Sequence, residues 1–296
     1  MPRKLSSNVK KVALVFEGGG MRASFSSAVV ATLLREKIHF DWVGGISAGA
    51  SCTANYLARD AERARRSFVD FADDPNFGSV GTFLQGKGLF NAHYIYEQTA
   101  GPKQTLPYDF DTFWANPARR RISAFRCDTG EAVFWDKSDL DTLPKLMRRV
   151  RASSSLPIMM PPVLISGHYY VDGALGPSGG IPLDIAQADG FDRFFVVLTQ
   201  PRDFVKLPQK MQRVFDVYFR KWPAAAEALA QRHENYNRTR EELFDLEASG
   251  KACLVLPAEM HVGNSTRDVA ALQETYDMGL AQSEAALPTW KSFLGL

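Results

Sequence analysis

The sequence predicts a three-layer α/β/α fold with a mostly parallel central sheet, and three observations carry this prediction. Short apolar runs alternate along the chain with longer segments of helical periodicity. The first two apolar runs each end in a glycine-rich turn that opens directly into a helical segment. The chain has 296 residues, 45% of them hydrophobic and 23% charged, so it can bury a full core.

The first part of the chain contains two strand–turn–helix units in succession. Val12 to Phe16 is a continuous apolar run that ends in three glycines, which is typical of a buried parallel strand. Apolar residues then recur at helical spacing from Met21 to Lys37. Phe40 to Ile46 predicts the second strand, and Ala48 to Arg66 predicts the second helix. Such repetition indicates the start of a parallel sheet.

The middle of the chain predicts antiparallel additions to this sheet. A stretch rich in glycine and phenylalanine, from Asp73 to Gly101, indicates a loop or a broken helix. Hairpin signals then join two pairs of strands, and a helix separates the pairs. The strands are expected at 120–125 with 131–135 and at 163–165 with 169–171, and the helix at 140–151.

The last third is mainly helical. A buried strand is expected at 194–198, polar helical sequence from 208 to 249, a strand at 252–256 and a helix at 266–286. We therefore expect a catalytic domain over residues 8–205. Residues 206–296 would form a mainly helical C-terminal extension packed on the same domain.

Composition excludes several classes of partner and cofactor. The formal net charge is only +2, so no nucleic-acid partner is indicated. Cys52, Cys127 and Cys253 are too few and too widely spaced for a disulfide framework or a zinc site. No clustered acidic loop or H-E-x-x-H pattern requires a metal, so no metal or cofactor is expected. The apolar run from Val12 is too short for a signal-peptide core, which favours a cytoplasmic protein.

The first motif with chemical meaning is Gly45-Ile46-Ser47-Ala48-Gly49, a G-x-S-x-G sequence. It lies where a predicted strand runs into a predicted helix, which is the context of a nucleophile elbow. The flanking glycines permit a sharp turn that exposes the Ser47 hydroxyl. The helix N-terminus would favour negative charge developing there. Ser47 is therefore the candidate nucleophile.

The second motif, Gly18-Gly19-Gly20-Met21-Arg22, follows the first predicted strand. Consecutive glycines expose backbone N–H groups that can form an oxyanion hole for a tetrahedral intermediate, and Arg22 adds positive charge. The run from Gly18 to Ala23 also fits the dinucleotide fingerprint G-x-G-x-x-A. That fingerprint requires an acidic residue at the end of the second strand, whereas Asp41 precedes most of this strand. Dinucleotide binding is the weaker alternative.

The third motif, Asp172-Gly173-Ala174, follows the strand expected at 169–171. A carboxylate at a strand end can reach a site at the edge of the sheet. An Asp-Gly pair is also common in ordinary turns. The motif gains meaning only through the other two.

Together, these motifs resemble the patatin-like phospholipases, whose pattern is G-G-G-x-R/K, then G-x-S-x-G, then D-G-G/A. The resemblance covers about residues 10 to 200. It includes the serine-rich segment at 153–157, which is similar to the S-x-x-x-P segment before the aspartate strand. Ala23 stands where the family often has glycine. Ala174 stands at the third position of the D-G-G/A pattern, where glycine is commoner.

The resemblance implies a serine lipid-acyl hydrolase that works with a Ser47–Asp172 dyad and no histidine. Gly19 and Gly20 N–H groups, with Gly18 and Arg22 beside them, would form the oxyanion hole, and the Ala48 N–H could assist. A carboxylate that acts as base needs a raised pKa, so Asp172 should be partly desolvated. The substrate would be a phospholipid or another acyl ester, which makes contact with an inner membrane surface compatible with the sequence.

Other hypotheses remain open on the sequence alone. A Ser–His–Asp triad would use His233 or His261, both of which follow Asp172 in the chain. An inactive relative would keep the fold as an interaction protein. The cluster Lys145, Arg148, Arg149 and Arg151 could meet lipid headgroups or form an ordinary solvated helix face.

Overall fold

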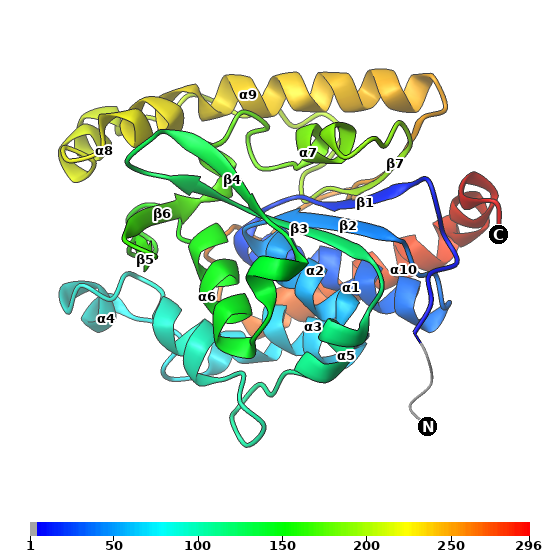
Figure 1. Cartoon of the computed structure of the whole chain (residues 1–296), viewed down its shortest axis with the longest axis horizontal. Helices are drawn as coiled ribbons and strands as arrows, with labels where there is room; N and C mark the ends of the chain where they lie inside the picture. The colour runs from blue at the N-terminus through cyan, green and yellow to red at the C-terminus, as the bar shows by residue number, and fades with distance from the viewer. Residues whose placement is uncertain (1–4) are drawn as a thin grey trace.

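A mixed eight-stranded sheet forms the centre of the part of the chain that the computed structural model describes, residues 5–296 (Figure 1). The first four residues of the basic N-terminal stretch lie outside the described residues. The strand order is β5-β6-β3-β2-β1-β7-β8, and β4 pairs with β3. Helices cover both faces, so the predicted α/β/α fold with a mostly parallel sheet is confirmed. The strands are β1 (Ala13–Phe16), β2 (Trp42–Ile46), β3 (Arg119–Arg126), β4 (Glu131–Trp135), β5 (Val163–Ile165), β6 (His168–Asp172), β7 (Phe194–Val197) and β8 (Ala252–Val255).

The central strands are buried on both faces because each face has its own layer of helices. Every residue of β1, β2 and β7 is buried, which explains their continuous apolar sequences. On one face lie α1 (Ala23–Arg35), α2 (Ala48–Leu57), α3 (Ala61–Phe68) and α10 (Val269–Leu294). On the other lie α7 (Leu183–Ala188) and the long α9 (Pro223–Ala248) (Figure 1). The two faces of β1 accordingly contribute to two separate core clusters.

Strand β3 brings two distant strand ends together along one of its edges. Residues 119–123 pair in parallel with β2, and residues 124–126 pair antiparallel with β6, while β4 occupies the opposite edge. Ile46 is opposite Ser123, and Asp172 is opposite the next residue, Ala124. Because β2 and β6 run toward each other, their carboxyl ends meet at this point. Both hairpins predicted from the sequence, β3–β4 and β5–β6, are present.

The helices differ from the sequence prediction mainly at their ends. The single helix expected from Ala48 to Arg66 is two helices, since Arg59 adopts a φ of 54° and Asp60 begins α3. The Asp60 carboxylate accepts a hydrogen bond from the Arg63 N–H at 2.8 Å, a standard N-cap. The stretch at 73–101 is broken as expected and contains α4 (Val80–Leu84) and a π-helical turn at Tyr94–Gln98. The sequence prediction missed α5 (Phe110–Ala115) and began α6 (Leu143–Ser153) three residues early.

The C-terminal residues share the sheet and the core of the preceding part. Strand β8 pairs in parallel with β7, and α8 (Gln212–Tyr218) precedes α9. Helix α10 packs along α1 so closely that a side chain at Gly279 would collide with Ala28 and Phe25. Near its end, the buried Trp290 ring meets Phe195 of β7 edge-on, with centroids 5.1 Å apart. α10 is therefore fixed to both the sheet and α1.

We expect Trp290→Ala to lower the free energy of unfolding by about 3–5 kcal/mol, because it leaves a cavity between α10 and the sheet. Thr289→Ala, at the exposed neighbouring position, is the matched control and should change stability by no more than about 0.5 kcal/mol. Urea denaturation of the three proteins measures both values. A Trp290→Ala effect as small as the control's would contradict the packing role of α10.

Candidate active site

Ser47 occupies a strained turn between β2 and α2, as the nucleophile-elbow prediction required. Its φ of 58° and ψ of −125° lie in a region that side chains rarely adopt, which costs about 1–3 kcal/mol. The turn is tight because a side chain at Gly45 would collide with the Gly49 carbonyl, and one at Gly49 with the Phe16 carbonyl. The Ser47 N–H donates to Ser153 Oγ at 2.9 Å, which ties the turn to the end of α6.

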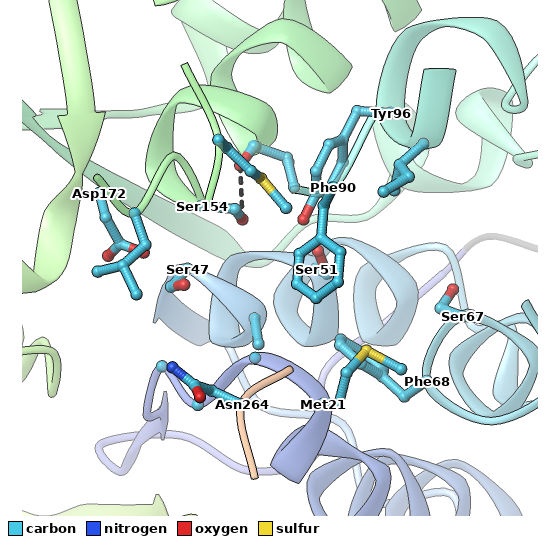
Figure 2. A pocket seen from close by; sticks show the side chains of 18 of the residues that line it. Met21, Ser47, Ser51, Ser67, Phe68, Phe90, Tyr96, Ser154, Asp172 and Asn264 are labelled. Atoms are coloured by element: carbon cyan, nitrogen blue, oxygen red, sulfur yellow. Dashed lines mark hydrogen bonds between the residues drawn. The ribbon is translucent and has the colours of Figure 1, made fainter. Parts of the chain in front are cut away.

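Asp172 ends β6 and begins the short turn Gly173–Leu175. One carboxylate oxygen accepts a hydrogen bond from the Ala174 N–H at 2.8 Å, which fixes its direction. Asp172 is 2% exposed and Ser47 9%. Burial raises the pKa of Asp172, while the Arg232 charge, the Ala174 N–H and a hydrogen bond from Ser47 act in the opposite direction. Figure 2 shows the two side chains facing each other in the wall of one pocket.

The glycine turn after β1 lines the same pocket, and two of its N–H groups are unengaged by the described residues. The Gly18 N–H donates to Gly180 O at 3.0 Å, and the Arg22 N–H to Gly19 O at 3.3 Å. Within residues 5–296, the N–H groups of Gly19 and Gly20 have no hydrogen-bond acceptor, and both residues line the pocket. Of the four residues expected at an oxyanion hole, Gly19 and Gly20 therefore have backbone donors available.

Buried contacts from later parts of the chain hold this glycine turn in place. The Glu17 carboxylate accepts hydrogen bonds from the Thr199 N–H at 2.6 Å and the Tyr236 hydroxyl at 2.8 Å. The Asn264 carbonyl accepts from the Met21 N–H at 3.1 Å. Sequence reasoning missed these residues, because nothing in the sequence indicates that β7, α9 and the segment after β8 meet here.

The pocket extends from the two polar side chains into an apolar chamber, and its cavity volume is about 110 Å³. In Figure 2, Ser47 lies between Asp172 and a group of apolar side chains that includes Met21, Phe68 and Phe90. Further apolar lining residues are Phe71, Phe77, Ile95, Leu106, Met147, Val150, Leu156, Met159 and Met160. The chamber thus joins a serine and a carboxylate to a space suited to a hydrocarbon chain.

The residues of the alternative hypotheses lie elsewhere. No histidine of residues 5–296 lines the pocket of Ser47 and Asp172. The His261 side chain is 73% exposed beside Glu259, and His233 Nδ1 lies 2.9 Å from the Ala230 carbonyl of its own helix. Asp41 precedes β2, at the opposite end of that strand from the glycine turn. The geometry thus favours neither a triad nor a dinucleotide site.

Comparison with known proteins identifies the family. The patatin-like phospholipase family model matches residues 14–186, more than half of the chain and all three motifs. The chain belongs to the patatin-like phospholipase family. It is accordingly a hydrolase that acts on ester bonds, and this family acts on lipid acyl esters. A second model, a domain of unknown function (DUF6363), matches residues 222–295.

Individual relatives of this patatin-like chain agree with that assignment. The uncharacterized protein YjjU of Escherichia coli (strain K12) is 26% identical over 279 residues, covering 91% of this chain and 75% of YjjU. Lysophospholipase NTE1 of Mycosarcoma maydis is 27% identical over 202 residues, covering 63% of this chain but only 9% of NTE1. The crystal structure of VipD from Legionella pneumophila is similar with a TM-score of 0.50, at 12% identity, over 94% of this chain and 67% of VipD. At that identity the likeness concerns the fold alone.

The raised pKa of Asp172 has a consequence for stability. The Asp172 carboxyl group binds its proton more tightly in the folded chain than in the unfolded chain. The free energy of unfolding therefore falls as the pH rises from 3.8, the ordinary pKa, through the raised pKa of the folded chain. The buried carboxylate is therefore a net cost at neutral pH.

We expect Asp172→Asn to raise the free energy of unfolding at pH 7.5 by about 0.5–2 kcal/mol, since the amide keeps the shape without the charge. The gain should shrink as pH falls toward 4, and denaturant unfolding at both pH values measures it. Asp203→Asn removes an exposed carboxylate and should have little effect at either pH. An Asp172→Asn protein less stable than wild type at pH 7.5 would contradict this account.

Proposed function

We propose that the protein hydrolyses lipid acyl esters with Ser47 as nucleophile and Asp172 as the base that activates it directly. The observation that carries this proposal is the register on β3, which places the ends of β2 and β6 opposite consecutive residues. A hydroxyl that faces a desolvated carboxylate is the arrangement that direct proton transfer needs.

The proposed reaction has two steps. Ser47 Oγ attacks the acyl carbonyl carbon while Asp172 accepts its proton, and Asp172 then returns the proton to the leaving alkoxide oxygen. Water next attacks the acyl-serine ester, with Asp172 again as base, and releases the fatty acid. The Gly19 and Gly20 N–H groups support this proposal, since they can bind the oxyanion in both steps. The Ala48 N–H at the start of α2 is a third candidate donor.

The chamber beyond Ser47 is the proposed acyl-chain site. Its wall consists mainly of phenylalanine, methionine and aliphatic side chains. Such side chains bind a hydrocarbon chain by burying its apolar surface and make no directed hydrogen bonds to it. The apolar side chains of residues 77–90 are divided between the chamber and the surface. Phe77 and Phe90 face the chamber, whereas Phe83 and Leu84 of α4 are exposed.

We also propose that one end of the molecule contacts a lipid surface. Helix α4, the β5–β6 hairpin and α8 lie together at the left end in Figure 1. These elements expose large apolar side chains: Val80, Phe83, Leu84, Leu164, Tyr169, Val214, Val217 and Tyr218. Residues 210–221 carry four exposed basic side chains and one acidic one, which suits an anionic surface. None of the helices in residues 5–296 has the length and hydropathy to span a bilayer.

The basic face of α6 is a poorer candidate for that contact, because carboxylates of the same chain bind three of its four cationic side chains. Arg148 and Arg151 bind Glu97 at 3.2 and 2.6 Å, and Lys145 binds Asp141 at 2.8 Å.

The dyad is tested with Ser47→Ala, Asp172→Asn and His261→Ala on a p-nitrophenyl ester and on phospholipid vesicles. We expect both dyad variants to lose at least ~1000-fold in kcat/KM while remaining folded, since each removes a group that acts in the transition state. His261→Ala should keep wild-type activity. Retained activity in Ser47→Ala, or an inactive His261→Ala, would refute the mechanism.

Leu84→Asp combined with Val217→Asp should weaken sedimentation with phosphatidylglycerol vesicles by at least ~10-fold, because two exposed apolar side chains no longer enter the lipid. Turnover of the short soluble ester should stay within about twofold. Leu296→Asp changes an exposed leucine at the opposite end and should bind vesicles normally. Equal binding by all three proteins would exclude this surface.

A further inference from the structure

Two arginines from distant parts of the chain lie beside Ser47 and Asp172. Arg22 follows the glycine turn, and Arg232 lies on α9, within the residues matched by the domain of unknown function. Both line the chamber that contains Ser47 and Asp172. The Arg232 charge acts on Asp172 and on Arg22, so the three groups are close neighbours.

Neither guanidinium is fully satisfied within the described part of the chain. The Nε atoms of Arg22 and Arg232 are buried and have no hydrogen-bond partner there. A buried donor without an acceptor is costly and marks a place for a ligand atom. Glu17, the carboxylate that favours the charged form of Arg22, already accepts from Thr199 and Tyr236.

Positive charge exceeds negative charge at this place. Lys206 also lies within range of both arginines, and burial together with the Arg232 charge lowers its pKa to about 7, while Glu17 opposes the shift. A second, shallower cavity that includes Lys206 shares Arg232 and Asn264 with the main chamber. Arg232 and Asn264 therefore lie where the two cavities adjoin, in the wall that also contains the dyad.

We infer that Arg232, together with Arg22, forms an anion subsite for a phosphate group of the substrate. The inference rests on the proposed function and deepens it. In a glycerophospholipid the phosphodiester lies only a few bonds from the acyl ester, so an acyl carbonyl at Ser47 leaves the phosphate near these side chains. Guanidinium groups bind phosphate oxygens through directed, charge-assisted hydrogen bonds. The C-terminal region thereby supplies a specificity residue to a catalytic site built by the preceding part.

The test compares two soluble substrates with the same acyl chain, a lysophosphatidylglycerol and a monoacylglycerol, both kept below their micelle concentrations. Arg232→Gln should lower kcat/KM for the lysophospholipid by about 10–100-fold and for the monoacylglycerol by less than about threefold. Arg232→Lys, which keeps the positive charge, should retain more of the preference for the lysophospholipid over the monoacylglycerol than Arg232→Gln does. Arg238→Gln removes an exposed arginine of the same helix, bonded to the Pro177 carbonyl and Asn235, and should behave as wild type.

Other outcomes overturn the inference. Equal losses on both substrates, with a shifted pH profile for the monoacylglycerol, would mean that Arg232 acts only through the pKa of Asp172. Inhibition of monoacylglycerol hydrolysis by inorganic phosphate, without a preference for the lysophospholipid, would assign the subsite to free phosphate. If wild type cleaves neither substrate and a fluorophosphonate leaves Ser47 unlabelled, the proposed function itself fails.

Discussion

The site depends on the hydrogen-bond register along one edge of β3. Strand β3 pairs first with β2 and then with β6, and these run toward each other until their carboxyl ends meet beside Ser123 and Ala124. Strand pairing is specific to the residue, because a shift by one position would turn every side chain to the other face. Backbone hydrogen bonds, rather than contacts between the two side chains, therefore bring Ser47 and Asp172 together.

The site lowers stability locally, and the surrounding core offsets that cost. Ser47 is held in a strained conformation, and Asp172 is buried with its pKa raised. Strained backbone and a buried carboxylate are features that persist only where the surrounding structure holds them in place. Gly45, Gly49 and Phe16 pack so closely around the turn that they restrict the conformations its backbone can adopt. The same packing explains why this turn needs glycine on both sides of Ser47.

The C-terminal region takes part in the site as well as in the core. Tyr236 of α9 binds Glu17 at the end of β1, and Asn264 binds the glycine turn through its carbonyl. These contacts position the glycine turn that lines the chamber. Arg232 lies on the same helix and lines the pocket. Helix α9 therefore both supports the glycine turn, through Tyr236, and contributes a side chain to the pocket wall.

The sequence by itself determined the fold class, the elbow and the candidate pair. Apolar runs with glycine turns are local signals, and strand–turn–helix order leads to a parallel sheet whatever the details of packing. Propensity did not predict the break at Arg59, and it missed α5, because short helices and their ends depend on single caps.

Only the tertiary structure decided which groups face the pocket. The sequence placed Gly18 and Arg22 beside the expected Gly19 and Gly20 donors, and the structure engages the N–H groups of Gly18 and Arg22 elsewhere. The structure also places His261 outside the pocket, whereas Arg232, from the polar helix α9, lines it. Such contacts join residues more than two hundred positions apart, and no local pattern encodes them, since they depend on how whole layers pack.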